Sequence, residues 1–267
     1  MLNVLIPTDF SVNSENAIAY AISFFKEQPC CFHLVHVTEN DLQKSSNSEI
    51  NTAKSNLQKQ LQLIKKSSDN TNHKVLVRLI QGKLIEVIKN EVENKGINLI
   101  IMATNGLSNP TKNKVGSNTI DVISKVKCNV IIVPQNATFN GLHDFTLVSD
   151  YSIFLGTEIL KTISMFIQMY SSTLHIVHLM KSKEIISQDQ IQNKESLRDY
   201  FREDNHFFHT LTNKNPNAAI QDFVDNKAIN LIAIAAKNIH LYQQLLFNTT
   251  KQTTDYQIKT PFLVLHE

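Results

Sequence analysis

The sequence predicts an α/β protein built from two similar domains in tandem, each an open parallel five-stranded sheet with helices on both faces. Apolar runs without polar alternation are separated by segments of helical periodicity, which is typical of parallel strands covered by helices. Several segments of the first half return in the second half in the same order. The length of 267 residues is also about twice that of a common domain.

The elements of the first half follow from its apolar pattern. Uninterrupted apolar runs indicate strands over residues 2–7, 32–37, 75–80, 97–102 and 130–134. Apolar residues at helical spacing indicate helices around residues 17–25, 57–64, 84–92 and 117–126. Ser11 or Ser14 is a candidate cap for the first helix, and Gly96 is placed to end the third. The scheme repeats from Phe145 to His266, with residues 181–205 the least regular part.

The internal repeat consists of three pairs of related segments: Val4–Asp9 with Phe145–Asp150, His33–Val37 with His175–Leu179, and Ile97–Ile100 with Ile229–Ile232. Their offsets of about 140 residues are too long for a solenoid repeat and indicate one domain present twice. We expect a first domain over residues 1–138 and a second over residues 143–267, joined by a linker near Gln135–Asp144.

The composition fits a globular protein and argues against several other classes. Hydrophobic residues make up 42% and charged residues 19%, which does not suit a disordered chain. A net charge of +2 gives no electrostatic reason to expect nucleic acid or a membrane as partner. No apolar run reaches the ~18 residues of a membrane-spanning helix, and the start is too short for a secretory signal. Three cysteines without metal-motif spacing suit a reducing compartment, so we expect a cytoplasmic protein.

A candidate binding site lies where the predicted parallel strands end. Ligands of open parallel sheets bind beyond the carboxyl ends of the strands, at the point where the strand order reverses. Residues 7–9 follow the first strand, and residues 103–106 follow the fourth. Gly116-Ser117 then opens a helix, whose free N–H groups and dipole favour a phosphate. The residues alone therefore indicate a nucleotide or phosphate site.

Each candidate also has a purely structural interpretation. Asp9 can be a turn or helix-capping aspartate, the glycines can mark turns, and Ser117 can be an ordinary helix cap. Lys112 and Lys114 can reach a phosphate or simply be solvated. Histidines spaced i, i+3 on strands point to opposite faces, so we expect no metal site. The P-loop, dinucleotide-binding and nucleophile-elbow patterns are all missing, and no catalytic set of acid, base and nucleophile emerges.

These residues resemble the universal stress protein family. Many members bind ATP through Gly-x2-Gly-x9-Gly-[Ser/Thr], and this chain has Ala103-x2-Gly106-x9-Gly116-Ser117. Residues 7–11 resemble the strand-one motif, whose aspartate sits at the adenosine end. His36-Val37 resembles the end of the second strand, whose valine backbone meets the adenine. The resemblance covers nearly the whole chain and implies the adenine nucleotide alpha hydrolase-like fold, with strand order 3-2-1-4-5.

The resemblance implies a non-catalytic stress-response protein that binds ATP, or a related adenine nucleotide, with Mg²⁺ as a possible companion of the phosphates. Its implied nucleotide-binding residues are Pro7, Thr8, Asp9, Val37, Ala103, Gly106, Gly116, Ser117 and Asn118. Family domains pair through their last strands. Here Val130–Val133 and Phe262–Leu265 are the candidates for such an internal pseudo-dimer, and a homodimer of chains is a further option.

The second half departs from the glycine pattern. At an offset of 132 residues, Gly106 corresponds to Asn238 and Gly116 to Asn248, and no glycine follows Gly156. A phosphate-binding loop without glycine is unfavourable, so we expect one working site in the first domain and a degenerate second domain. Because Ala103 replaces the first glycine, an alternative stays open: a nucleotide-free tandem scaffold, or a sensor of another small ligand. A slow nucleotide hydrolase is a third hypothesis.

Overall fold

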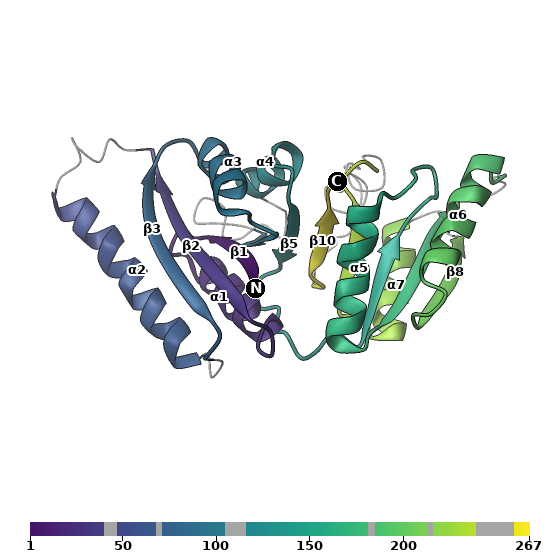
Figure 1. Cartoon of the computed structure of the whole chain (residues 1–267), viewed down its shortest axis with the longest axis horizontal. Helices are drawn as coiled ribbons and strands as arrows, with labels where there is room; N and C mark the ends of the chain where they lie inside the picture. Colours follow the sequence, from purple (N-terminus) through teal and green to yellow (C-terminus); the bar gives the residue numbers. More distant parts are fainter. Residues whose placement is uncertain (40–46, 68–70, 105–115, 181–184, 213–215, 239–258) are drawn as a thin grey trace. The chain divides into compact units, whose positions relative to one another are not determined.

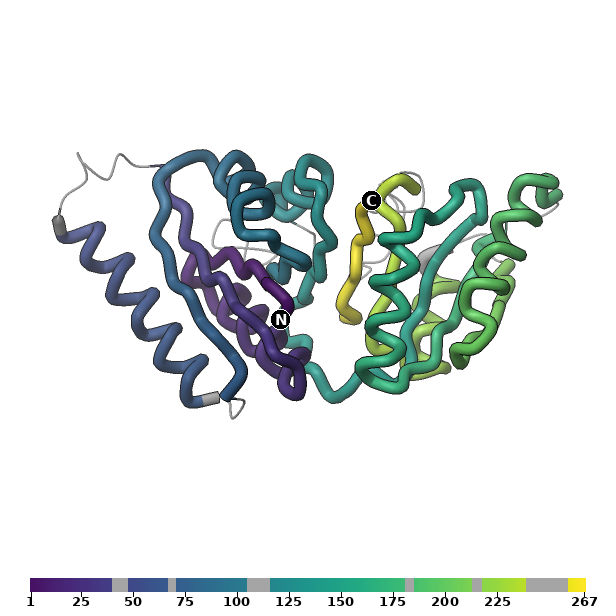
Figure 2. The backbone as a smooth tube through the Cα atoms, viewed as in Figure 1, coloured from purple at the N-terminus to yellow at the C-terminus, as the bar shows by residue number. Residues whose placement is uncertain are grey.

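The computed structural model describes residues 1–39, 47–67, 71–104, 116–180, 185–212, 216–238 and 259–267. The chain forms two compact units, residues 1–140 and residues 141–267, called the first and the second unit below. Figure 1 labels the helices and strands, and Figure 2 follows the backbone through each unit. Of the helices that the structure describes, none combines the length and the hydrophobicity needed to span a lipid bilayer.

The first unit is built on a parallel sheet with the strand order β3-β2-β1-β4-β5 (Figure 1). Its strands are β1 (Leu2–Pro7), β2 (Cys30–Thr38), β3 (Lys74–Gln81), β4 (Leu99–Ala103) and β5 (Asn129–Val133). Its helices are α1 (Val12–Phe24), α2 (Asn47–Ser67), α3 (Leu84–Lys95) and α4 (Ser117–Lys125). Helix α1 packs beside α2, and α3 packs beside α4. The strand order reverses between β1 and β4, so the switch point lies between these two strands.

The second unit repeats this arrangement. Its strand order is β8-β7-β6-β9-β10, again 3-2-1-4-5 when the strands are counted along the unit, and its described pairs are parallel. The strands are β6 (Asp144–Val148), β7 (Thr173–Met180), β8 (His206–Thr212), β9 (Leu231–Ala235) and β10 (Phe262–Leu265). The helices are α5 (Thr157–Tyr170), α6 (Gln188–Tyr200) and α7 (Pro216–Lys227). The predicted fold class is therefore confirmed.

Local sequence explains where several elements begin and end. In the centre of β1, Val4, Leu5 and Ile6 are fully buried, as expected for a strand with helices on both faces. The Ser11 side chain caps α1 by accepting a hydrogen bond from the Ser14 N–H group. Gly96 ends α3 in the left-handed conformation that glycine adopts at low cost.

Several predicted elements have other bounds in the structure; helix α2, for example, begins at Asn47, well before the apolar repeat at residues 57–64. Strand β4 begins at Leu99 rather than at Ile97, because the preceding Asn98 binds the Asn3 N–H group through its side-chain oxygen, at 2.8 Å. The segment 181–205, irregular in sequence, contains helix α6. That helix starts with a capping box in which Ser187 and Gln190 bind each other's backbone N–H groups.

The repeat extends to individual hydrogen bonds. In the first unit, the Asn98 N–H group donates to the Asn3 carbonyl at 2.9 Å. In the second unit, the Asn230 N–H group donates to the Asp144 carbonyl at 2.8 Å, and its side-chain oxygen accepts from the His143 N–H group at 3.1 Å. The repeated Ile-Asn-Leu-Ile sequence thus makes the same connection between the first and fourth strands of both units.

The three cysteines are structural. Cys30, Cys31 and Cys128 are buried free thiols. Burial raises the pKa of Cys30 and of Cys128 to about 12, and it also raises the pKa of Cys31. Because the thiolate is the reactive form, these side chains are poor nucleophiles at neutral pH.

Candidate functional site

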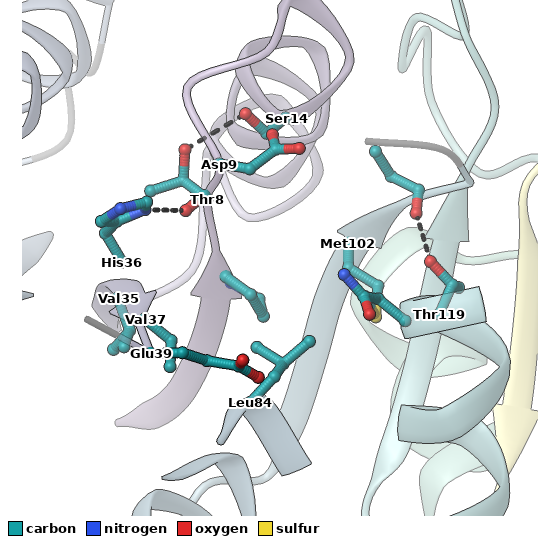
Figure 3. A pocket seen from close by; sticks show the side chains of 13 residues that line it. Thr8, Asp9, Ser14, Val35, His36, Val37, Glu39, Leu84, Met102 and Thr119 are labelled. Carbon is teal, nitrogen blue, oxygen red and sulfur yellow. Dashed lines mark hydrogen bonds between the residues drawn. The ribbon is translucent and has the colours of Figure 1, made fainter. Parts of the chain in front are cut away.

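A cavity of about 290 Å³ lies at the carboxyl ends of β1, β2 and β4 in the first unit (Figure 3). The strand ends supply most of its wall, and the first turns of α1, α3 and α4 supply the rest. This place includes the reversal of strand order between β1 and β4, where open parallel sheets bind ligands. The cavity therefore coincides with the region that the sequence indicates.

The structure brings six of the nine predicted site residues to this cavity: Pro7, Thr8, Asp9, Val37, Ala103 and Asn118. Gly116 and Ser117 do not line it, although they lie directly before Asn118 at the start of α4. Gly106 lies outside the described residues, as do Lys112 and Lys114. The structure therefore describes Ala103 at one end of the glycine motif and Gly116-Ser117 at the other, and Gly106 lies outside the described residues.

The turn after β1 is held by side chains that also line the cavity. The Asp9 Oδ1 atom accepts hydrogen bonds from the Ser11 N–H group at 3.1 Å and from the Ser11 hydroxyl at 2.5 Å. Between them, Phe10 has a φ of 65°, which is uncommon for a residue with a side chain. Its N–H group donates to Thr8 Oγ1 at 3.2 Å, which stabilises this conformation. Asp9 is therefore a turn aspartate, and it also faces the cavity.

Two hydroxyl groups and a buried amide form a polar cluster beside this turn. The Thr8 and Ser14 hydroxyls lie 3.1 Å apart and both belong to the cavity wall. Thr8 Oγ1 also donates to Gln60 Oε1 at 3.2 Å. Gln60 is only 3% exposed, and its Nε2 atom has no hydrogen-bond partner among the described residues. Gln60 does not line the cavity itself, and it supports the wall from behind through Thr8.

His36 lines the cavity with a defined tautomer. Its Nδ1 atom lies 2.7 Å from the Thr8 carbonyl oxygen (Figure 3). A carbonyl oxygen only accepts hydrogen bonds, so Nδ1 carries the proton and Nε2 of the neutral ring is an acceptor. The Phe10 ring packs on the imidazole with a centroid distance of 4.3 Å. The turn after β1 and the end of β2 are thereby held together.

The opposite wall is formed by the end of β4 and the start of α4. Thr119 Oγ1 donates to the Ala103 carbonyl at 2.9 Å (Figure 3), and the Gly116 N–H group donates to the Thr104 carbonyl at 2.6 Å. Gly116 has φ −69° and ψ 156°, a conformation open to any residue. The Gly116 N–H group therefore already donates to a protein carbonyl, and it is not free to bind a phosphate. The N–H groups of the first helical turn, from Ser117 onward, have no intrahelical acceptor.

The described wall of the cavity carries two carboxyl groups, those of Asp9 and Glu39, and no lysine or arginine. Figure 3 shows the Glu39 side chain extending from the end of β2 toward Leu84, at the start of α3. Carboxylates repel phosphate groups and attract hydrogen-bond donors. This side of the cavity is therefore suited to a neutral, donor-bearing group, and a phosphate is better placed at the N-terminus of α4.

Sequence reasoning missed several wall residues. Ser14 was visible only as a candidate helix cap, and Glu39 and Leu84 stand outside any motif. Gln60 comes from α2, 52 residues after Thr8, and no local pattern indicates the contact. Within the described residues, no group of three or more His, Cys, Asp or Glu side chains is arranged so that it could hold a metal ion.

The second unit repeats the turn but surrounds it differently. Asp150 Oδ1 accepts from the Ser152 N–H group at 3.0 Å and from its hydroxyl at 2.6 Å, and Tyr151 has a φ of 58°. The same Asp150 oxygen also accepts from Asn238 Nδ2, at 2.8 Å. Asn238 is 6% exposed and occupies the sequence position that corresponds to Gly106. The carboxylate of the second unit is therefore bound by a protein amide.

Helix α6 adds two more amides to this turn. Gln190 Nε2 donates to the Asp150 carbonyl at 2.6 Å, and Asn193 Nδ2 donates to the Tyr151 carbonyl at 2.8 Å. The Tyr151 ring is buried and stacks on His178 with a centroid distance of 5.0 Å. Protein side chains thus satisfy both the carboxylate and the turn backbone in this unit.

Comparison with known proteins agrees with this architecture. Residues 1–134 match the universal stress protein family. A universal stress protein from Archaeoglobus fulgidus DSM 4304 has a similar structure, with a TM-score of 0.71 at 17% identity, covering 99% of this chain and 96% of that chain. A structure from Pseudomonas aeruginosa UCBPP-PA14, assigned to the same family, has a TM-score of 0.62 at 15% identity, covering 98% of this chain and 92% of that chain.

No curated protein matches the chain by sequence. At these identities the two solved structures establish similarity of fold across both units. The family match covers the first unit, including the strand-end turn and the start of α4. On this evidence the chain belongs to the universal stress protein family.

Proposed function

We propose that the first unit binds an adenine nucleotide, ATP with Mg²⁺, and that binding serves regulation in a stress response rather than a chemical reaction. The observation that carries this proposal is the meeting of separate sequence motifs in one cavity. The strand-one residues Pro7–Asp9, the strand-two residue Val37 and the strand-four residue Ala103 lie far apart in sequence and line the same space. Asn118, from the first turn of α4, joins them.

The chemistry of the wall supports a division of the nucleotide between two regions. A volume of about 290 Å³ is at the small end for ligand pockets, which suits the nucleoside portion. Asp9 and the Val37 backbone would hold the adenosine end, where ribose hydroxyls and the exocyclic amine supply donors. Ala103, with Gly106, would approach the ribose and phosphate. Ser117 and Asn118 would bind phosphate through N–H groups at the start of α4.

Mg²⁺ would reduce the repulsion between the phosphates and the carboxylates of Asp9 and Glu39. We therefore expect ATP affinity to fall when the metal is removed with a chelator. We expect binding without turnover, since among the described wall residues we identify no nucleophile paired with a base. The nucleotide would act by favouring the conformation that binds it best.

Titration calorimetry of the full chain with Mg-ATP tests the proposal, and we expect one site per chain. Gly116→Asp is the informative variant, since a carboxylate at the start of α4 would repel the phosphates. Gly116 has ordinary backbone angles and aspartate is a favoured helix cap, so this substitution should not harm folding. Unchanged affinity in Gly116→Asp would place the phosphates elsewhere, and two sites would contradict the assignment to the first unit.

The alternative is a nucleotide-free scaffold or a sensor of another small ligand. Two observations favour it: Ala103 stands in place of the first glycine of the motif, and the Gly116 N–H group is already bound by the Thr104 carbonyl. Ala103→Gly separates the two proposals. A rise from undetectable to micromolar ATP affinity would show that the natural site is degenerate.

Three further expectations stay predictions: the cytoplasmic location, pairing of the last strands as a pseudo-dimer, and a homodimer of chains. Steady phosphate release at ~1 s⁻¹ or faster would overturn the non-catalytic assignment. Slow release that Asp9→Ala abolishes would instead support the hydrolase hypothesis.

A further inference from the structure

A chain of three polar side chains crosses the sheet of the second unit, apart from the strand-end turn. It joins Asp144 of β6, His175 of β7 and His209 of β8. His175 Nε2 lies 2.8 Å from Asp144 Oδ1, and His175 Nδ1 lies 2.9 Å from His209 Nε2. His175 is only 4% exposed, so water cannot readily replace either partner.

The positions of the hydrogens follow from what each atom can do. A carboxylate accepts hydrogen bonds and does not donate them, so His175 Nε2 must carry a proton. In the neutral ring Nδ1 is then an acceptor, and the His209 Nε2–H group must donate to it. With both rings neutral, each of the two contacts therefore contains one hydrogen.

One additional proton fits this chain without breaking a contact. If it binds at His209 Nδ1, the His209 Nε2–H group still donates to His175, and the positive charge is balanced through His175 by Asp144. A second additional proton does not fit, because two N–H groups would face each other across 2.9 Å. We propose that Asp144, His175 and His209 form a binding site for one proton, which makes the second unit responsive to mild acidification.

The surroundings set the pH range of this response. Phe207 and Phe223 enclose His175, with ring centroid distances of 5.8 and 5.9 Å. Asp144 from β6 is the carboxylate bound to His175, and Lys227 from α7 acts electrostatically on His209. Burial lowers the pKa of His209, and the neighbouring His175 and Lys227 lower it further. Proton uptake therefore occurs below the ordinary histidine value of about 6.5.

The sign of the stability effect follows from this lowered pKa. The unfolded chain takes up a proton on His209 at a higher pH than the folded unit does. The stability that neutral His209 contributes to the second unit is therefore fully present above pH ~6.5 and is lost as pH falls through the lower folded-state value. Acidification below this pH would therefore destabilise the second unit.

The first unit contains a natural control at the same three positions. His33 corresponds to His175, Asn3 to Asp144 and Arg78 to His209, by the register of the paired strands. Arg78 Nη2 lies 2.8 Å from His33 Nδ1, and Asn3 Oδ1 lies 3.3 Å from His33 Nε2. Arginine is a permanent donor, and asparagine offers no charge to balance a proton. This arrangement therefore holds a neutral histidine and excludes the additional proton.

Nitrogen-15 NMR of the histidine rings, recorded on the full chain between pH 7.5 and 4.5, tests the proposal. We expect His175 and His209 to report one shared step that adds a single proton, with His175 keeping hydrogen on Nε2. Asp144→Asn copies the first unit and removes the balancing charge, so the midpoint should move about one pH unit lower. His209→Arg copies Arg78 and should abolish the step at His175.

Independent titration of the two rings near pH 6.5 in the unaltered chain would overturn the proposal. An unchanged midpoint in a folded Asp144→Asn variant would overturn it as well. The amide spectrum of each variant shows whether the second unit is folded. If His209→Arg fails to fold, the titration of the unaltered chain still distinguishes a shared step from two separate ones.

Discussion

The turns after β1 and β6 are nearly identical in backbone and different in their surroundings. In both, an aspartate accepts two hydrogen bonds from the serine two residues later, and an aromatic residue adopts a positive φ. In the first unit Asp9 lines a cavity of about 290 Å³. In the second unit Asp150 is bound by the Asn238 amide. The turn aspartate is thus a folding device in both units, and its neighbours decide whether it also serves a ligand.

The polar contacts of His33 in the first unit and of His175 in the second unit also differ. The first unit uses Arg78, which also pairs with Glu91 of α3, to fix His33. The second unit uses His209, and the residue packed on it from α7 is Phe223, with a ring centroid distance of 4.9 Å. A permanent ion pair in one unit is replaced by a titratable pair and an aromatic contact in the other. The two units therefore share the geometry of this contact and differ in its charge.

The largest effect should come from breaking the ion pair of the first unit. Arg78→Met leaves Glu91, whose side chain is 12% exposed, without its cation. Losing one partner of a buried pair costs ~3–5 kcal/mol. Because the Arg78 side chain is 26% exposed, we expect a loss of about 2–3 kcal/mol in the free energy of unfolding. Hydrogen exchange resolved by residue would locate the loss in the first unit.

His209→Met at the corresponding position of the second unit is the matched control. It removes one hydrogen bond and no ion pair, so the expected loss is about 1 kcal/mol. Equal losses in the two variants would show that the ion pair contributes no more than a neutral contact.

The two turn aspartates should differ in their effect on ATP binding, although both stabilise a turn. Asp9→Ala removes a cavity carboxylate, and we expect ATP affinity to fall about 10- to 100-fold, a loss of roughly 1.4–2.8 kcal/mol. Asp150→Ala should leave affinity unchanged and destabilise the second unit, because Ser152 and Asn238 lose their acceptor. Calorimetry measures the ATP affinity of both variants, and hydrogen exchange measures the stability of each unit. Equal effects on affinity would remove the distinction between the units.

Asn238→Ala isolates the amide that binds the turn carboxylate of the second unit. It leaves Asp150 with its Ser152 contacts and removes one buried hydrogen bond, so we expect a loss of about 1 kcal/mol from the second unit. ATP affinity and stoichiometry, measured by calorimetry, should not change. The appearance of a second nucleotide site in Asn238→Ala would show that this amide alone closes it.

The last prediction concerns how the stability of the first unit depends on pH. Burial lowers the pKa of His33, and Arg78 and Lys95 lower it further. The unfolded chain therefore takes up this proton first, and the stability that His33 contributes is present above pH ~6.5 and lost as pH falls through the folded-state value. Urea unfolding followed between pH 7.5 and 5 should show the decline. His33→Gln should flatten it, and an equal slope in this variant would assign the decline to other groups.

Much of the fold was predictable because it depends on local pattern and repetition. The apolar run of β1 and the start of α4 at Ser117 have their expected positions. Helix α6 was not predictable from periodicity, since only Leu197 among its residues is buried. Its start depends on the capping box of Ser187 and Gln190 instead. A helix that buries so little of its surface leaves almost no hydrophobic signal in sequence.

The sequence by itself determined the duplicated strand pattern, the turn chemistry of Asp9 and Asp150 and the family of the first unit. Tertiary structure alone decided which side chains meet: Gln60 with Thr8, Asn238 with Asp150, and His209 with His175. These pairs are separated by 52, 88 and 34 residues. A turn is specified by neighbours in the chain, whereas a site needs strand order and register to bring distant side chains together.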